Sequence, residues 1–189
     1  VGNIHGRSLK VNHIFQIHNF KFDFEELKNE IKEITRYRSD TKNTINWTQF
    51  SLQSNSPDKK GIKYSQDAVG KAKGKGAEEW ECSFVYPLFD APIINSFINH
   101  FKLHRTRLMI QEPRSVLTYH KDWSQRIHLP IDTNEDCMML LGNMQAYHLE
   151  QGKIYYTDTT KRHTAFNCHN FIRRLHIVGC LPLNTRTWE

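Results

Sequence analysis

Apolar residues recur at helical spacing near the start of the chain. Within residues 22–37, the positions that share one helical face are Phe24, Leu27, Ile31 and Ile34. Asp23, with Glu26 three residues later, is typical of a capping box at a helix start. The pattern therefore predicts an amphipathic helix that begins near Asp23.

A second helical pattern covers residues 90–101. Its apolar face consists of Ile94, Phe97, Ile98 and Phe101. Asp90 stands where an N-cap residue is expected, and Pro92 lies in the first turn, where proline is tolerated. We expect a second amphipathic helix with Asp90 as its N-cap.

After Arg105 the helical spacing gives way to short apolar runs separated by turn residues. Eight such runs occur before Leu181, namely RTRLMIQ, SVLTYH, RIHLPI, CMMLLG, QAYHLE, KIYYTD, HTAFN and RRLHIVGC. Eight short strands in so few residues predict an antiparallel sandwich or barrel. With the helices, the chain is expected to fold as one mainly β domain, residues 1–189, in which 105–181 form the core.

The remaining segments are less regular. Residues 44–53 and 78–89 have strand-like content, and the stretch between them, 54–76, is a long loop rich in Ser, Gly and Lys. A loop of this length is more often functional or disordered than an inert connector.

The positive charge of the chain is concentrated in that loop. The net charge is +6, and six lysines account for all of it: Lys59, Lys60, Lys63, Lys71, Lys73 and Lys75. No aromatic-basic RNA motif accompanies these lysines, which disfavours nucleic-acid binding. The chain also lacks an apolar run long enough to cross a bilayer, a signal-peptide core and a CxxC pair, so we expect a cytoplasmic protein with reduced thiols.

Candidate chemistry begins in LTYHKDWSQRIHLP, residues 117–130. On a strand, alternate residues share a face, which would place Val116, Thr118, His120 and Asp122 together. Arg126 and His128 share a face in the same way. Polar groups that converge on a buried face need a partner or a metal, so His120 and Asp122 form either a hydrogen-bonded pair or part of a metal site. The H-x-D spacing alone is weak evidence, because this chain is rich in histidine.

His163, in KRHTAFN, supplies a third candidate ligand. Two histidines and one carboxylate leave three positions open on a metal, which is the facial triad of non-heme Fe(II) oxygenases. A keto-acid co-substrate would need a cationic anchor for its far carboxylate, and a bidentate arginine suits this best. Arg174 on the last strand is the candidate.

The ordered segments YHKD, RIHLPIDTN, LEQGKIYYTD, RHTAFN and RRLHIVG resemble the aspartyl/asparaginyl β-hydroxylase-like family of Fe(II)/2-oxoglutarate oxygenases. The resemblance covers residues 105–180, and it implies a double-stranded β-helix, a cupin-like jelly-roll barrel. It also implies that His120, Asp122 and His163 bind Fe(II) and act in catalysis, and that Arg174 holds 2-oxoglutarate.

Several assignments stay open. Counting ten residues on from His163 gives Arg173 as the anchor, whereas the R-x-H-I-V match gives Arg174, which we prefer because it shares a face with His176 and Val178. Arg126 either contacts the co-substrate or substrate or pairs with a surface acid. His128 and His176 either contact 2-oxoglutarate or are core histidines. Trp123 either lines the substrate pocket or only packs, and we expect Asn167 to fix the turn after His163.

Two departures from the family pattern bear on the substrate. An acidic position common in the family is Lys153 here, whereas Asp122, which the animal peptidyl hydroxylases lack, is present. The chain therefore resembles bacterial and phage-type members, some of which act on free amino acids, and the retained carboxylate argues against halogenation.

The resemblance implies a dioxygenase that hydroxylates an unactivated carbon of an amino acid or peptidyl residue, with O2 consumed and succinate and CO2 as co-products. The alternatives are a non-catalytic jelly-roll metal-binding protein and a basic nucleic-acid-binding module.

Overall fold

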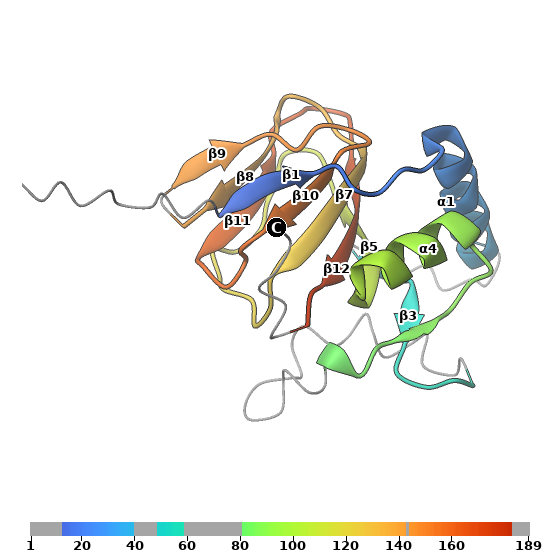
Figure 1. Ribbon diagram of the computed structural model, residues 1–189. Coiled ribbons are helices and arrows are strands. Elements are labelled where there is room, and N and C mark those ends of the chain that lie inside the picture. Colours follow the sequence, from blue (N-terminus) through green and yellow to red (C-terminus); the bar gives the residue numbers. More distant parts are fainter. Residues whose placement is uncertain (1–12, 40–48, 59–80, 143, 183–189) are drawn as a thin grey trace, which may run out of the picture.

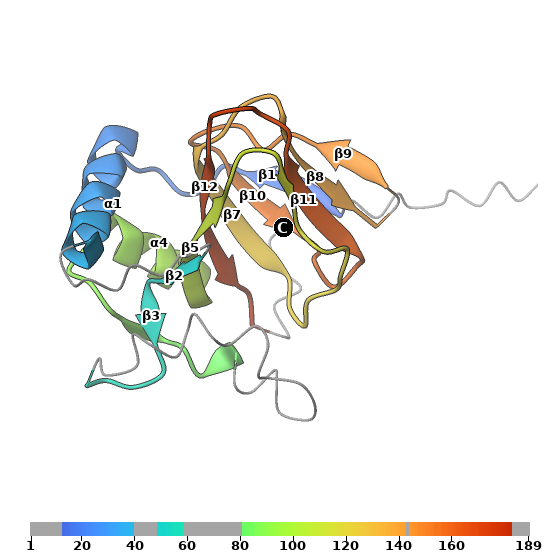
Figure 2. The same ribbon diagram turned by 180° about the vertical axis from the view of Figure 1, so that it is seen from behind.

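The computed structural model describes residues 13–39, 49–58, 81–142 and 144–182. Two antiparallel sheets face each other, and helices α1 (Phe24–Ser39) and α4 (Pro92–Phe101) lie beside the larger sheet (Figures 1 and 2). The larger sheet has the order β1 (Ile14–Ile17), β10 (Ile154–Thr157), β7 (Arg126–Asp132), β12 (Arg174–Cys180), β5 (His104–Gln111) and β2 (Gln49–Ser51). The smaller sheet has the order β6 (Ser115–Val116), β11 (His163–Asn167), β8 (Cys137–Leu141) and β9 (Gln145–Tyr147).

The eight strands predicted after Arg105 are confirmed as β5 to β12. They form the two sheets of a double-stranded β-helix, as the resemblance implied. Strands β5 to β12 are hydrogen-bonded within two separate sheets and not as a closed barrel. A functional site is therefore expected in the space between the two sheets, which their hydrogen bonding leaves open.

The larger sheet separates an apolar core from a polar interior. On β7 the side chains of Ile127 and Leu129 belong to the core packed against the helices, whereas the alternate residues Arg126 and His128 line the space between the sheets. Strand alternation explains this division, since successive side chains point to opposite faces. One sheet thus provides both the core and one wall of the site.

Helices α1 (Phe24–Ser39) and α4 (Pro92–Phe101) cover the outer face of that sheet (Figure 1). Their predicted apolar faces are confirmed, and the fully buried members are Leu27, Ile31, Ile34, Ile94, Phe97, Ile98 and Phe101. At the start of α1, Oδ1 of Asp23 accepts hydrogen bonds from the backbone N–H groups of Glu25 and Glu26 at 2.9 and 3.0 Å. The expected cap is present.

The predicted cap of α4 is wrong. The N-cap residue is Ala91, which has no capping side chain, and Asp90 is exposed. The carboxylate of Glu30 on α1 instead accepts the backbone N–H groups of Ile93 at 2.7 Å and Ile94 at 3.0 Å. A side chain from the neighbouring helix therefore satisfies the free donors that open α4.

Replacing Glu30 with alanine should lower the free energy of unfolding by about 1–2 kcal/mol, because two backbone donors lose their acceptor. Urea unfolding monitored by circular dichroism measures this loss. Asp90→Ala is the matched control and should change stability by less than about 0.5 kcal/mol. A larger loss for Asp90→Ala than for Glu30→Ala would contradict the assignment.

The segments before β5 follow the sequence only in part. Residues 44–53 give β2 and β3 (Gln53–Ser54), with 44–48 outside the described residues. Of residues 78–89, 78–80 lie outside the described residues, and within 81–89 the only strand is β4 (Tyr86–Pro87), which pairs with β3. Glu81 is helical there and turns inward to pair with arginines of the larger sheet.

Of the loop predicted at 54–76, Ser54 belongs to β3, and residues 59–76, which carry the six lysines, lie outside the described residues. Among the helices that are described, none combines the length and the apolar character needed to cross a membrane.

Candidate metal centre and cavity

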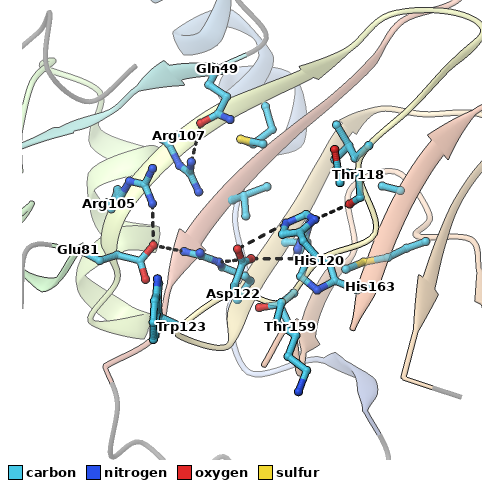
Figure 3. Close-up of a pocket in the computed structure, with 18 of the residues that line it drawn as sticks. Gln49, Glu81, Arg105, Arg107, Thr118, His120, Asp122, Trp123, Thr159 and His163 are labelled. Atoms are coloured by element: carbon cyan, nitrogen blue, oxygen red, sulfur yellow. Dashed lines mark hydrogen bonds and ion pairs between the residues drawn. The ribbon is translucent and has the colours of Figure 1, made fainter. Parts of the chain in front are cut away.

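A cavity of about 690 Å³ opens between the two sheets. Strands β5, β7 and β12 form one wall, β8 and β11 contribute to the other, and residues 117–123 form part of the rim. Figure 3 shows the side chains that enter it. This volume is within the range of small-molecule pockets, and the lining mixes apolar and charged groups.

The three predicted metal ligands, His120, Asp122 and His163, meet inside this cavity (Figure 3). One donor atom of each lies within 4.8 Å of the other two. Oδ1 of Asp122 is 3.6 Å from Nε2 of His120, and Oδ2 is 3.6 Å from Nε2 of His163. Ligands about 2 Å from one ion are roughly 3–4 Å apart, so the cluster can hold a metal.

Backbone carbonyls fix both imidazoles in the form that binds metal. Nδ1 of His120 is 2.5 Å from the carbonyl oxygen of Thr118, and Nδ1 of His163 is 3.0 Å from that of Lys161. A carbonyl oxygen only accepts, so each Nδ1 donates its proton and each Nε2 keeps a lone pair. Metal-bound histidines commonly have such a partner on the second nitrogen. Both free lone pairs are on the nitrogens that approach Asp122.

His120 and Asp122 lie close together for a different reason from the predicted one, which was alternation along a strand. Strand β6 ends at Val116, so alternation along a strand does not place His120 and Asp122. His120 and His163 form an isolated antiparallel β-bridge, in which each backbone N–H donates to the carbonyl of the other residue, at N···O distances of 3.0 and 2.8 Å. The N–H of Asp122 donates to the carbonyl of Thr159 at 2.9 Å. Contacts with the β10–β11 region therefore shape the non-strand segment around the site.

Arg126 keeps the central carboxylate charged. Burial alone would raise the pKa of Asp122, but Arg126 and the neighbouring His120 hold that pKa well below its usual range. Nε of Arg126 donates to Oδ2 of Asp122 at 3.1 Å. The nearby Asp122 carboxylate raises the pKa of His120, whereas burial lowers the pKa of His163. The cluster offers an anionic ligand between two imidazoles.

Arg126 is itself held by a second acid. Nη1 of Arg126 is 2.9 Å from Oε1 of Glu81, which also accepts a bond of 2.7 Å from Nη1 of Arg105. Ser124 donates to the other oxygen of Glu81 at 2.9 Å. All four side chains are buried. Of the two readings left open for Arg126, pairing with a surface acid is not what the structure shows, because its acidic partners are the buried Glu81 and the half-buried Asp122.

The two adjacent arginines at the start of β12, Arg173 just before the strand and Arg174 as its first residue, have different environments. Arg174 is buried and lines the cavity, and its Nη1 donates to Oε1 of Gln111 at 2.9 Å. Arg173 is exposed, with Nε 3.3 Å from a carboxylate oxygen of Glu112. Only Arg174 can therefore reach a ligand in the cavity.

The charge of Arg174 has no acidic partner within the described part of the chain. Besides Gln111, its guanidinium contacts both ring nitrogens of His176 at 3.0 Å. Burial lowers the pKa of Arg174 to about 10, so it stays charged at neutral pH. Burial also lowers the pKa of His176 well below its usual range, which keeps that ring neutral beside the cation. A buried cation without a counter-ion favours an anionic ligand.

His128 is a second buried polar side chain in the cavity that lacks a suitable partner. Its side chain is 7% exposed and lines the cavity, and neither ring nitrogen has a hydrogen-bond partner among the described residues. Burial holds its pKa well below the usual value, so the ring is neutral. Buried polar groups almost always have a partner. His128 therefore indicates a place for a polar ligand atom.

Two other predicted residues take structural places around the cavity. Trp123 lines it while remaining 53% exposed, at the rim. Asn167 is fully buried, and its side chain bonds to the carbonyls of Gln111 and Ile172 and to the N–H of His169. Asn167 fixes the turn that follows β11, as expected.

Sequence reasoning missed a group of polar residues at the site, namely Gln49, Glu81, Arg105, Arg107 and Gln111. Four of them line the cavity directly, and Gln111 contacts Arg174. For three of them the sequence did contain a signal. Arg105, Arg107 and Gln111 occupy alternate positions along β5, on the face that also carries Met109. No local sequence pattern indicates Glu81.

The profile of the aspartyl/asparaginyl β-hydroxylase family matches residues 16–179. The chain belongs to this family. The match includes both helices, every strand that forms the cavity and all three candidate ligands. The resemblance noted for residues 105–180 is therefore confirmed and extends through the N-terminal half.

Several solved structures of low sequence identity are similar to this chain, and HygX shares its fold. HygX of Streptomyces hygroscopicus, solved with nickel and 2-oxoglutarate bound, is 10% identical, with 94% of this chain and 85% of HygX covered and a TM-score of 0.51. A double-stranded β-helix protein of Klebsiella pneumoniae is 18% identical over 42% of this chain and 63% of that chain, with a TM-score of 0.34. A 2OG-Fe(II) oxygenase family protein of Burkholderia pseudomallei is 14% identical over 49% and 53%, with a TM-score of 0.37. The chain spans less than two thirds of the last two proteins.

Proposed function

We propose that the protein is an Fe(II)- and 2-oxoglutarate-dependent oxygenase that hydroxylates a carbon of an amino acid or of a peptidyl residue. The observation that carries this proposal is the pairing, in one cavity, of a His-Asp-His donor set with the buried cation Arg174. Neither feature alone indicates a reaction. Together they suit a metal and a diacid that ligates it.

The donor set fits iron. Two neutral imidazoles and one carboxylate on one side of an ion leave positions open for a chelating co-substrate and O2. When bound, iron with O2 and 2-oxoglutarate supplies the oxidising power, placing one oxygen atom on the substrate carbon and the other in succinate as CO2 is released. His120, Asp122 and His163 would hold the ion.

The protein's own residues bind and orient the co-substrate. Arg174 would pair with the carboxylate far from the metal, because it is a buried guanidinium with only amide and imidazole partners. His128 would donate a hydrogen bond to the nearby part of the bound ligand, or accept one from it. This bond would supply the partner that its ring nitrogens lack. Arg126 would keep Asp122 oriented and ionised.

The relatives support this assignment. The family bears the name of a hydroxylase, and HygX, which shares the fold, holds nickel and 2-oxoglutarate in its crystal structure. The presence of Asp122 supports hydroxylation over halogenation, because the carboxylate remains one of the three candidate metal ligands.

Release of succinate from 2-oxoglutarate tests the proposal. Purified protein with Fe(II), ascorbate and air should form succinate slowly without a substrate, and faster with one from a screen of free amino acids and peptides. Omission of Fe(II), 2-oxoglutarate or O2 should abolish the product. Absence of succinate from protein shown to bind Fe(II) and 2-oxoglutarate would contradict catalysis and favour a non-catalytic binding protein.

A further inference from the structure

A chain of four side chains with alternating charge ends at the central candidate metal ligand. Its members, in order, are Arg105, Glu81, Arg126 and Asp122. Figure 3 shows the carboxylate of Glu81 directed toward Arg105 and toward the side of the cavity that holds Asp122. Oε1 of Glu81 is shared, at 2.7 Å from Nη1 of Arg105 and 2.9 Å from Nη1 of Arg126. Glu81 is not one of the three candidate ligands, so its contact with the metal cluster runs through Arg126.

Arg126 has two acids to balance its buried charge. The side chain is 3% exposed, with Nε 3.1 Å from Oδ2 of Asp122 and Nη1 at Glu81. Its remaining side-chain hydrogen bond within the described residues is to Sγ of Cys180. Burial would lower the pKa of Arg126, but Asp122 and Glu81 raise it. A guanidinium is planar and rigid, so the bond of Nη1 to Glu81 also fixes the direction in which Nε meets Asp122.

Glu81 is itself held on every side. It is buried, and its second carboxylate oxygen accepts a hydrogen bond from the hydroxyl of Ser124 at 2.9 Å. Burial would raise the pKa of Glu81, but Arg126 and Arg105 lower it, so the carboxylate stays ionised. Both oxygens are occupied by side chains of the protein. Glu81 is therefore built to hold its neighbours and not to bind the ion directly.

The backbone that delivers Arg105 to Glu81 is irregular. The φ angle of Arg105 is 46°, in the left-handed region that residues other than glycine rarely adopt. In the same part of the sheet, the register between β12 and β5 shifts between Val178 and Cys180. Such irregularities cost free energy and are found where a side chain is redirected, often beside a functional site. The pairing of Arg105 with Glu81 is thus not a by-product of a regular strand.

We propose that Glu81 is a positioning residue of the metal centre, which acts through Arg126 to hold the Asp122 carboxylate in place for the ion. Arg105 and Ser124 anchor Glu81 in this role. The inference rests on the proposed function, because it takes the His-Asp-His cluster to be a metal site. Partners that orient a ligand without touching the ion commonly govern metal affinity.

Titration of Mn(II) into the metal-free protein tests this role. Glu81→Gln keeps the size of the side chain and removes its charge, whereas Glu81→Asp keeps the charge and is too short to hold both arginines. Each should weaken Mn(II) binding by about tenfold or more, the loss typical of an outer partner in a metal site. Calorimetry gives the Kd, at a temperature at which circular dichroism shows each protein folded. Should Glu81→Gln not fold, Glu81→Asp decides alone.

Two comparisons separate positioning from stability and from charge. Glu30→Ala removes the carboxylate that caps α4, so it should lose stability but keep the wild-type Kd of Mn(II). Arg126→Gln should weaken Mn(II) binding by itself. In that background Glu81→Gln should cost less than about threefold more, because the residue through which it acts is already gone.

Three results would overturn the proposal. Wild-type Mn(II) affinity in Glu81→Asp would show that the position of this carboxylate does not matter, and wild-type affinity in Glu81→Gln would show that its charge does not. A loss as large in the Arg126→Gln background as in wild type would show that Glu81 acts without Arg126. Failure of the proposed function has a different signature. Wild type would then bind no Mn(II), or would bind it and form no succinate, and the second result leaves the role of Glu81 intact.

Discussion

Asp122→Ala should lower Fe(II)-dependent succinate formation by at least about 100-fold and weaken Fe(II) binding by a similar factor. The substitution leaves only two imidazoles, which cannot form the three-sided ligand set. It also removes one of the two acidic partners of Arg126 and leaves that buried cation with Glu81 alone. Fe(II) affinity and succinate yield, measured on the same preparation, give both losses.

Two further variants make this result specific. Asp122→Asn keeps the size of the side chain and should also lose metal binding, because the amide carries no negative charge. Asp132→Ala, at the far end of β7, removes an exposed carboxylate and should retain at least about half of the wild-type turnover. Wild-type metal affinity and turnover in Asp122→Ala would contradict the metal assignment.

Arg174→Ala should raise the Kd of 2-oxoglutarate by about 100-fold or more, since a buried charge pair with a ligand is worth about 2–5 kcal/mol. Fe(II) binding should change little, because within the described part of the chain the hydrogen bonds of Arg174 run to Gln111 and His176 and to none of the three candidate ligands. Titration of 2-oxoglutarate into the Mn(II)-loaded protein separates the two affinities.

The adjacent residue provides the matched control. Arg173→Ala removes the same side chain from the preceding position, which is exposed and paired with Glu112. The Kd of 2-oxoglutarate should stay within about twofold of wild type. The reverse result, with the larger loss in Arg173→Ala, would show that the alternative spacing from His163 identifies the anchor.

Periodicity in the sequence was sufficient for the regular elements. The apolar face of α1 and the eight runs after Arg105 gave the helices and strands, because their alternation reflects burial on one side of each element. The segment that contains His120 was predicted as a strand for the same reason. The prediction was wrong because the backbone leaves the ladder after Val116 and is held by His163 and Thr159 instead.

The parts that could not be predicted depend on contacts between distant residues. Glu30 caps α4 from another helix, and Glu81 joins Arg105 and Arg126 from a segment without a regular pattern. Local sequence carries no information about either pairing. By contrast, the choice between Arg173 and Arg174 was open in spacing alone, and the face shared with His176 pointed to the side chain that lines the cavity.

The central claim is that the His-Asp-His cluster, the metal and Arg174 form a single binding site. Calorimetric titration of 2-oxoglutarate into the protein, with and without Mn(II) and in the absence of O2, tests this most directly. We predict binding with one 2-oxoglutarate per chain when metal is present, and affinity at least about tenfold weaker without it, because the metal would hold the other end of the diacid. Equal affinity for 2-oxoglutarate with and without metal, or no binding in either case, would contradict the claim.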